Sequence, residues 1–245
     1  MFIRAKENLI SILQLGTIDY ATGLRLQQQL VDLRKQEKIG DVLLLLEHTP
    51  VITLGRNAKA SNVVASPDFL QQRGVELFES DRGGDVTFHG PGQIVGYPIF
   101  DLRGFATLDG KRKTLGVIEF VRRLEQVLMR TCADFAIPTK RVCGLTGVWT
   151  ESEAKLAAIG VHISRFVTSH GFALNVNTDL SYFNLIIPCG ITSKPVTSMQ
   201  KELGRELALN DVAESISRNF GVVFQSQILW VEALDAILAA PSARR

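Results

Sequence analysis

The segment from Arg82 to Ile99 constrains the fold of this chain more than any other stretch. It holds five glycines and two prolines among residues that favour β-strands. A backbone of this composition turns tightly around short strands and leaves its main chain open to another molecule. Arg82 at the start and His89 at the centre add a charge and a titratable group, which a purely structural turn does not need. On this segment alone, a glycine-rich β-hairpin and a binding site are equally good interpretations.

The length of 245 residues suffices for one sizeable α/β domain or two small ones. Because no low-complexity or Pro/Ser-rich linker divides the chain, we predict a single domain over residues 1–245. The formal net charge of +2 is too small for a nucleic-acid-binding face, so we expect no nucleic acid partner. Residues 1–15 lack the apolar core of a signal peptide, and no run is apolar enough to cross a bilayer. We therefore expect no membrane partner.

The three cysteines, Cys132, Cys143 and Cys189, are an odd number at wide spacing and include no Cys-x-x-Cys pair. This usage favours free thiols in a reducing cytoplasm. The four histidines have neither the paired spacing nor the cysteine partners of a zinc site, so we predict no metal.

Strands and helices are expected to alternate along the chain. We predict helices that begin at Asp19 and Ser66 because both residues can accept hydrogen bonds at a helix N-terminus. The Gln27–Gln29 run should face mostly outward, and Gly74 should end the second helix. Strands are expected at residues 10–15, 41–47, 51–54 and 75–78, of which 41–47 is an unbroken apolar run typical of a central strand.

The second half should contain the clearest helix, residues 115–135, whose apolar residues recur every three or four positions. Cys132 then serves as a small core residue. A short turn or helix is expected at 179–183, and a final helix from Asn210 to Gly221. Three successive antiparallel strands are predicted at residues 147–150, 155–163 and 171–176. This order predicts an α/β fold, an α+β sandwich with a mixed sheet and flanking helices, and no nucleotide-binding glycine motif is present.

Two downstream segments add to the glycine-rich one: Lys155–Gly160 and Ile187-Pro188-Cys189-Gly190-Ile191. Together the three closely resemble the lipoyl(octanoyl) transferase family, from about Leu44 to Met199 and in consistent order. The resemblance implies a catalytic domain related to biotin and lipoate protein ligases. It also implies transfer of an octanoyl group from octanoyl-acyl carrier protein to a specific lysine of lipoyl domains, the first step of endogenous protein lipoylation.

The candidate nucleophile is Cys189, because Pro188 and Gly190 present its side chain rather than pack it in a regular helix. A thiol needs a nearby cation or base to be an efficient nucleophile at neutral pH. Lys155, in an otherwise apolar run, is the candidate. Taken singly, a buried small cysteine and a solvent-facing lysine are the commoner cases. In the family resembled, the matching cysteine carries the acyl group as a thioester and the matching lysine is its partner, which implies a Cys189–Lys155 dyad.

The resemblance also implies the substrate-binding residues, with apolar walls from Ile94 and Leu174 and with His89 and His170 near the ligand. The family commonly has tyrosine where this chain has Phe88, which puts a role for that hydroxyl in doubt. Main-chain N–H groups near Gly160 or Gly190 are candidates for stabilising an oxyanion. The implied substrate-binding residues are Arg82, Gly83, Gly84, Asp85, Val86, Thr87, Phe88, His89, Ala158, Ile159, Gly160, Gly171, Phe172 and Ala173.

No cofactor is expected, because 4′-phosphopantetheine arrives on the donor carrier protein and the transfer needs no ATP. The implied acceptors are apo lipoyl domains of 2-oxoacid dehydrogenase complexes and the glycine cleavage H protein. The donor in this family is acidic, so a basic edge would assist encounter. We expect this edge at Arg103, Lys111, Arg112, Lys113, Arg122 and Arg123.

Two alternatives remain open from the sequence. The first is an ATP-dependent lipoate or biotin protein ligase of related fold, which does not need a nucleophilic cysteine. The second is a non-catalytic module that binds acyl groups or lipoylated proteins. A general cysteine hydrolase is less favoured, because no Cys-His-Asn order with a recognisable local signature is present.

Overall fold

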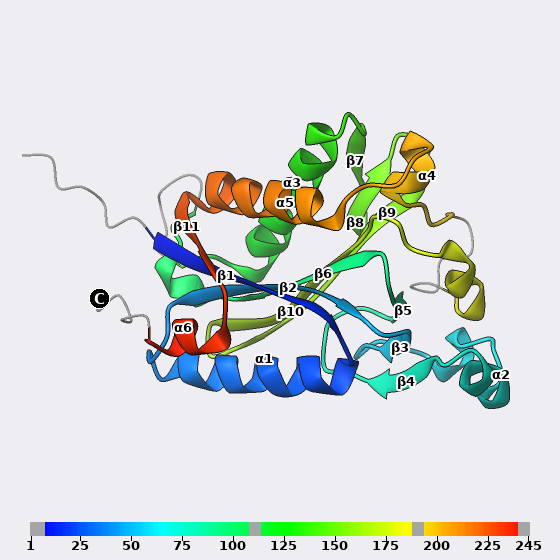
Figure 1. Cartoon of the computed structure of the whole chain (residues 1–245), viewed down its shortest axis with the longest axis horizontal. Helices are drawn as coiled ribbons and strands as arrows, with labels where there is room; N and C mark the ends of the chain where they lie inside the picture. Colours follow the sequence, from blue (N-terminus) through cyan, green and yellow to red (C-terminus); the bar gives the residue numbers. More distant parts are fainter. Residues whose placement is uncertain (1–7, 108–113, 188–193, 240–245) are drawn as a thin grey trace, which may run out of the picture.

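The structure, a computed structural model, describes residues 8–107, 114–187 and 194–239, and it contains two β-sheets (Figure 1). The larger sheet has eight strands in the order β11-β1-β2-β6-β10-β9-β8-β7, and the smaller has the order β4-β3-β5. The strands are β1 (Asn8–Ile18), β2 (Asp41–His48), β3 (Val51–Leu54), β4 (Glu76–Glu79), β5 (Val86–His89), β6 (Gln93–Ile99), β7 (Thr139–Val142), β8 (Leu145–Thr150), β9 (Lys155–Ser164), β10 (Val167–Asn175) and β11 (Ser226–Val231).

Helices cover both faces of the larger sheet, with α3 and α5 on one face and α1 and α6 on the other (Figure 1). The first face buries the larger apolar cluster, which includes Phe100, Phe120 and Phe220, and the second buries a smaller one around Leu44 and Tyr97. The helices are α1 (Tyr20–Lys35), α2 (Pro67–Gln72), α3 (Val117–Asp134), α4 (Met199–Leu203), α5 (Leu209–Phe224) and α6 (Leu234–Ala239), with 3-10 turns η1 (Ala60–Asn62), η2 (Leu102–Gly104) and η3 (Leu180–Leu185).

The predicted mixed sheet with flanking helices is confirmed. The strand β2 lies centrally, parallel to β1 and antiparallel to β6, and all its apolar residues are buried. The strands β8, β9 and β10 form the antiparallel series expected from the sequence. Polar side chains begin the helices as predicted: Asp19 accepts the N–H of Thr22 at 2.7 Å, and Ser66 accepts that of Phe69 at 3.3 Å.

Two local predictions need correction. Gln28 and Gln29 are exposed, as expected of a run that faces mostly outward, but Gln27 is buried, and its Oε1 accepts the backbone N–H of His170 at 2.7 Å. Gly221 does not end the last predicted helix, since α5 continues to Phe224 and closes with Gln225 in the left-handed region. Instead, Gly221 allows close packing, because a Cβ there would lie 3.0 Å from Ile228 of β11.

The glycine-rich segment is also not a simple hairpin. Its first strand, β5, pairs with β3 of the small sheet, whereas its second, β6, pairs with β2 and β10 of the large sheet. The turn at Gly90–Gly92 therefore connects the two sheets. Gly92 adopts a φ of 78° and lies against the backbone of Asn177, where a Cβ would come within 2.6 Å of the Asn177 carbonyl oxygen. The segment thus brings the small sheet against the open face of the large one.

Two further observations bear on the sequence predictions. Cys132 is fully buried within α3, and burial raises the pKa of its thiol to about 12, in agreement with a core role. Within the residues that the structure describes, no helix combines the length and apolar character needed to cross a membrane.

Candidate active site

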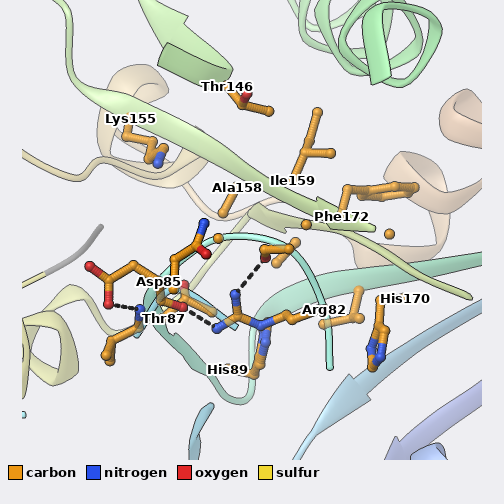
Figure 2. A pocket seen from close by; sticks show the side chains of 18 of the residues that line it. Arg82, Asp85, Thr87, His89, Thr146, Lys155, Ala158, Ile159, His170 and Phe172 are labelled. Carbon is orange, nitrogen blue, oxygen red and sulfur yellow. Dashed lines mark hydrogen bonds between the residues drawn. The ribbon is translucent and has the colours of Figure 1, made fainter. Parts of the chain in front are cut away.

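A pocket of about 380 Å³ lies between the glycine-rich segment and the strands β9 and β10 (Figure 2). The strands β6, β10 and β9 form its wall on the face of the large sheet that also carries α1. Sequence-predicted residues from the glycine-rich segment, from Lys155–Gly160 and from residues 171–173 meet here, whereas no described residue of the segment at 187–191 lines the pocket. Those that line the pocket are Arg82, Gly83, Gly84, Asp85, Val86, Thr87, His89, Lys155, Ala158, Ile159, Gly160, Gly171, Phe172 and Ala173.

Phe88 does not line this pocket. Successive side chains of a strand point to opposite faces, so Thr87 and His89 reach the pocket while Phe88 packs into an apolar cluster on the other side of β5. Its ring stacks on that of Tyr182 with centroids 4.6 Å apart. A hydroxyl on this ring would face the apolar cluster, which explains why phenylalanine is compatible with the site.

The residues 82–85, which we name the strap, cross over the large sheet and are fixed by the Arg82 side chain. Arg82 is 8% exposed, and its guanidinium donates to the Thr53 carbonyl and hydroxyl and to the carbonyls of Asp85 and Gly83. The Gly83 N–H donates to the Val161 carbonyl at 3.0 Å. Arg82 therefore organises the strap, rather than standing as a surface charge available for an ion pair.

The glycines of β9 and β10 allow the backbone of neighbouring segments to approach closely. A Cβ on Gly160 would lie 2.5 Å from the Gly83 carbonyl oxygen, and one on Gly171 would lie 2.1 Å from that of Gly96. The space that these glycines leave is filled by neighbouring main chain. The small side chains that remain on the pocket wall are those of Ala158 and Ala173.

Lys155 begins β9 and lies toward the end of the pocket away from His170 (Figure 2). It is 9% exposed, and its Nζ lies 5.0 Å from the centroid of the Trp149 ring. Its backbone is held on both sides, because its N–H donates to the Pro195 carbonyl and its carbonyl accepts from Thr197. Gly147 makes room for it, since a Cβ there would meet Lys155 Cε at 3.2 Å.

Cys189 lies outside the described residues, as does Gly190, so the structure gives no distance for the predicted dyad. The described chain stops at Ile187, whose N–H donates to the Asn62 carbonyl at 2.7 Å, and Asn62 in turn donates to the Asp85 carboxylate. The described chain resumes at Lys194, next to Pro195, whose carbonyl accepts the backbone N–H of Lys155.

Three buried histidines surround the end of the pocket away from Lys155. His89 donates from Nδ1 to Gln93, and burial, with the charges of His48 and Arg82, lowers its pKa to about 3. Burial likewise lowers the pKa of His48 to about 4, and its Nε2 accepts the hydroxyl of Tyr97 at 2.7 Å. The pKa of His170 is also lowered by burial, against the opposing effect of Asp81, which accepts from His170 Nε2 at 2.7 Å. At neutral pH these rings are therefore neutral hydrogen-bonding groups.

Several pocket residues escaped the sequence analysis. Tyr20 is the first residue of α1, and Tyr97 lies in β6, so neither carries a motif that distinguishes it from a core aromatic. Asn57 and the hairpin residues 144–146 also line the pocket, and all but the half-buried Leu145 are exposed. The glycine at 144 before strand β8 was the one available signal for this hairpin.

Other expected positions differ from the structure. Ile94 and Leu174 do not line the pocket; both lie in the apolar cluster on the opposite face of the large sheet. Arg123 is not on an exposed edge, since it is 6% exposed and donates to the Ala106 carbonyl and Glu119. Arg103 and Arg122 are partly exposed but pair with Asp101 and Glu125, respectively. Lys111, Arg112 and Lys113 lie outside the described residues.

No group of three His, Cys, Asp or Glu side chains arranged to hold a metal occurs in the described part of the chain. What the pocket offers chemically is a lysine at one end, a wall of small apolar side chains, and neutral hydrogen-bonding rings at the other end. Such a cavity suits an unbranched acyl chain whose reactive carbonyl lies beside the lysine.

Comparisons with known proteins show which proteins this chain is similar to. Residues 19–221 match the family described as the lipoyl protein ligase A/B catalytic domain. The chain is 65% identical over 235 residues to an octanoyltransferase of Koribacter versatilis, covering 95% of this chain and 91% of that protein. It is 57% identical over 237 residues to an octanoyltransferase of Acidobacterium capsulatum, covering 94% of this chain and 96% of that protein.

Solved structures show the same fold at much lower identity. A putative lipoate protein ligase from T. acidophilum with bound lipoic acid has a TM-score of 0.71 at 12% identity, covering 95% of this chain and 93% of that one. A lipoate-protein ligase A bound with ATP has a TM-score of 0.68 at 13% identity, covering 93% of this chain and 88% of that one. The expected relation to lipoate ligases is therefore confirmed at the level of the fold.

Proposed function

Because this chain belongs to the lipoyl(octanoyl) transferase family of acyltransferases, we propose that it moves an octanoyl group from octanoyl-acyl carrier protein to a specific lysine of lipoyl domains. The observation that carries the proposal is the pocket itself, in which Lys155 lies at one end of a wall built from Ala158 and Ala173. An unbranched acyl chain can lie along this wall with its carbonyl near the lysine.

The first half of the proposed reaction forms an acyl-enzyme on Cys189. The Cys189 thiolate attacks the thioester carbonyl, so a bond forms between Sγ and the acyl carbon. The bond from that carbon to the pantetheine sulfur then breaks, and Lys155 Nζ gives its proton to the departing thiolate. One thioester replaces another, so no ATP is consumed.

The second half transfers the acyl group to the acceptor. The lysine amine of a lipoyl domain attacks the acyl-enzyme carbonyl, and the now neutral Lys155 takes the proton that the amine loses. The bond to Cys189 Sγ breaks and restores the thiolate beside the lysine cation. The product amide is more stable than the thioester, which drives this half of the reaction forward.

The test is an intact-protein mass spectrum after brief incubation with octanoyl-acyl carrier protein without ATP. We expect one octanoyl adduct on the wild type, discharged by an apo lipoyl domain and absent from Cys189→Ala. Cys143→Ala is the matched control, because Cys143 is an exposed free thiol next to the pocket mouth and its loss should leave the adduct in place. Transfer that persists in Cys189→Ala and needs ATP and free octanoate would instead indicate a ligase.

The proposal extends to partners and organisation. Both sheets line one pocket, which supports a single catalytic domain over residues 1–245. We infer that the donor is the acidic carrier protein and that the acceptors include lipoyl domains of 2-oxoacid dehydrogenase complexes and the glycine cleavage H protein. Free thiols at Cys132 and Cys143 favour a reducing cytoplasm as the site of reaction.

A further inference from the structure

The pocket wall is arranged in levels along the strands β6, β10 and β9. At the first level, the polar side chains of Gln93, Asn175 and Lys155 border a small cavity, and Gln93 donates to Asn175 at 2.8 Å. At the second level, Ala173 pairs with Val95 on one side and Ala158 on the other. Polar, reactive side chains are therefore followed directly by small apolar ones.

The third level is closed by aromatic side chains. Tyr97 follows Val95 by two residues, so its side chain points to the same face of β6. Next to it, Gly171 pairs with Gly160, and the strap covers Gly160 through Gly83. Tyr20 reaches the same end of the pocket from the first turn of α1.

The aromatic end is held rigidly. The Tyr97 hydroxyl donates to His48 Nε2 at 2.7 Å, and His48 Nδ1 donates to the Ile18 carbonyl at 3.0 Å. Tyr20 donates to Ser80 at 3.0 Å, and its ring stacks on that of His89 with an interplanar angle of 8°. Tyr97 is 4% exposed and Tyr20 1% exposed, so both rings are packed into the pocket wall and their hydroxyls are held by hydrogen bonds.

The spacing of these levels matches one acyl length. Gln93 and Tyr97 are four residues apart in β6, which corresponds to roughly 13 Å at about 3.3 Å per residue. An extended octanoyl chain has seven carbon–carbon bonds of about 1.5 Å and spans roughly 9 Å along its axis. The difference between these two lengths, roughly 4 Å, is about one van der Waals contact between the terminal methyl group and the Tyr97 ring.

We infer that Tyr97, fixed by His48 and flanked by Tyr20, is the end stop that selects a chain of about eight carbons. This inference rests on the proposed function, because it assumes that the reacting carbonyl lies at the level of Lys155. A decanoyl chain would have to displace a ring that is hydrogen-bonded and buried. A shorter chain would leave apolar space beside Val95 and Ala173 unfilled.

The test offers the enzyme an equimolar mixture of hexanoyl, octanoyl, decanoyl and dodecanoyl carrier protein and reads the adducts by intact-protein mass spectrometry. Tyr97→Leu shortens the stop, and we expect its decanoyl-to-octanoyl ratio to rise about tenfold or more over the wild type. Tyr97→Phe keeps the ring and should keep the wild-type ratio. Tyr182→Leu is the matched control, because the Tyr182 ring packs against Phe88 outside the pocket.

A second variant guards against failure of Tyr97→Leu to fold. Ala158→Leu fills the middle level and should shift the preferred adduct from octanoyl toward hexanoyl. Unchanged adduct ratios in both folded variants would overturn the end stop and leave the proposed function intact. A wild type that accepts no acyl group from any donor would overturn the proposed function instead. Free octanoate and decanoate can also be titrated by calorimetry, which involves no acyl transfer. The affinity for decanoate relative to octanoate should rise in Tyr97→Leu as the adduct ratio does.

Discussion

A single guanidinium organises the strap that borders the pocket. Arg82 holds both Thr53 of the small sheet and the carbonyls of the strap, so the strap keeps its shape although it contains two consecutive glycines. Glycines lose the most conformational entropy on folding, and strong fixed hydrogen bonds offset that cost. The cation that the sequence suggested as a ligand contact thus also positions the backbone of the strap.

We predict that Arg82→Lys lowers the free energy of unfolding by about 2 kcal/mol or more, because an ammonium cannot reproduce the planar array of donors. Transfer activity should fall as well, since the strap would no longer be fixed. Urea denaturation measures the first effect. Arg56→Lys is the control: Arg56 is exposed in the neighbouring loop, and its replacement should change stability by no more than about 0.5 kcal/mol. Equal stability of the two variants would contradict the role given to Arg82.

We predict that Gly160→Ala displaces the strap from β9, because the new methyl group would lie 2.5 Å from the Gly83 carbonyl oxygen. Overpacking of this kind costs about 1–3 kcal/mol of stability, and here it should also lower kcat/KM for octanoyl transfer. Gly40→Ala is the matched substitution, since no atom lies within 4 Å of a Cβ at Gly40. Full activity in Gly160→Ala would show that the strap contact is dispensable.

At the scale of elements, α3 positions the hairpin of β7 and β8 that borders the pocket mouth. Glu125 of α3 is fully buried, and its carboxylate accepts from Arg122 and Arg141 at 2.7 Å and from the Gly147 N–H at 3.2 Å. One acidic side chain thus connects the helix, β7 and β8. Residues 144–146, at the turn of this hairpin and the start of β8, reach the pocket.

We predict that Glu125→Gln loosens this hairpin and costs about 3 kcal/mol, because it removes the charge that two arginines share in a buried position. Hydrogen exchange of the amides in residues 139–150 should accelerate more than that of the remaining sheet. Glu214→Gln on the exposed side of α5 provides the control and should leave the exchange pattern unchanged. Uniform acceleration over the whole sheet would indicate a general loss of stability instead.

Elements with a strong local signal were predictable from the sequence. The apolar repeat gave α3, and the unbroken apolar run gave the central strand β2. The strand β11 went unpredicted, because none of its residues is fully buried and it depends on parallel pairing with β1, more than two hundred residues away. The end of α5 was misplaced because Gly221 resembles a helix terminus, whereas its role is contact with β11.

At the scale of the whole molecule, the pocket exists because the small sheet is placed against the face of the large one that α1 leaves uncovered. The glycine-rich segment indicated close backbone approach at the strap, and the family resemblance implied the glycines of β9 and β10. The aromatic end of the pocket was not found from the sequence. The Tyr97–His48 contact there joins residues 49 positions apart, and the nearby Gln27–His170 contact joins residues 143 positions apart. Neither pair is visible as a local pattern.

The buried histidines also give the whole molecule a defined response to acid. In the unfolded chain a histidine takes up a proton near pH 6.5. In the folded chain the pKa is lowered to about 4 for His48 and about 3 for His89, chiefly by burial. Their stability contribution is therefore fully present above pH 6.5 and is lost as pH falls toward 4, because the unfolded chain then binds protons that the folded chain does not.

We predict that the free energy of unfolding falls by about 1.4 kcal/mol per pH unit for each of these two histidines between pH 6 and pH 4.5. Urea denaturation at several pH values measures the slope. His48→Gln should reduce the slope by the share of one histidine, since glutamine can still accept from Tyr97 but does not titrate. His162→Gln, at a partly exposed ring, is the surface control. A slope that His48→Gln leaves unchanged would mean that His48 is not buried in its neutral form.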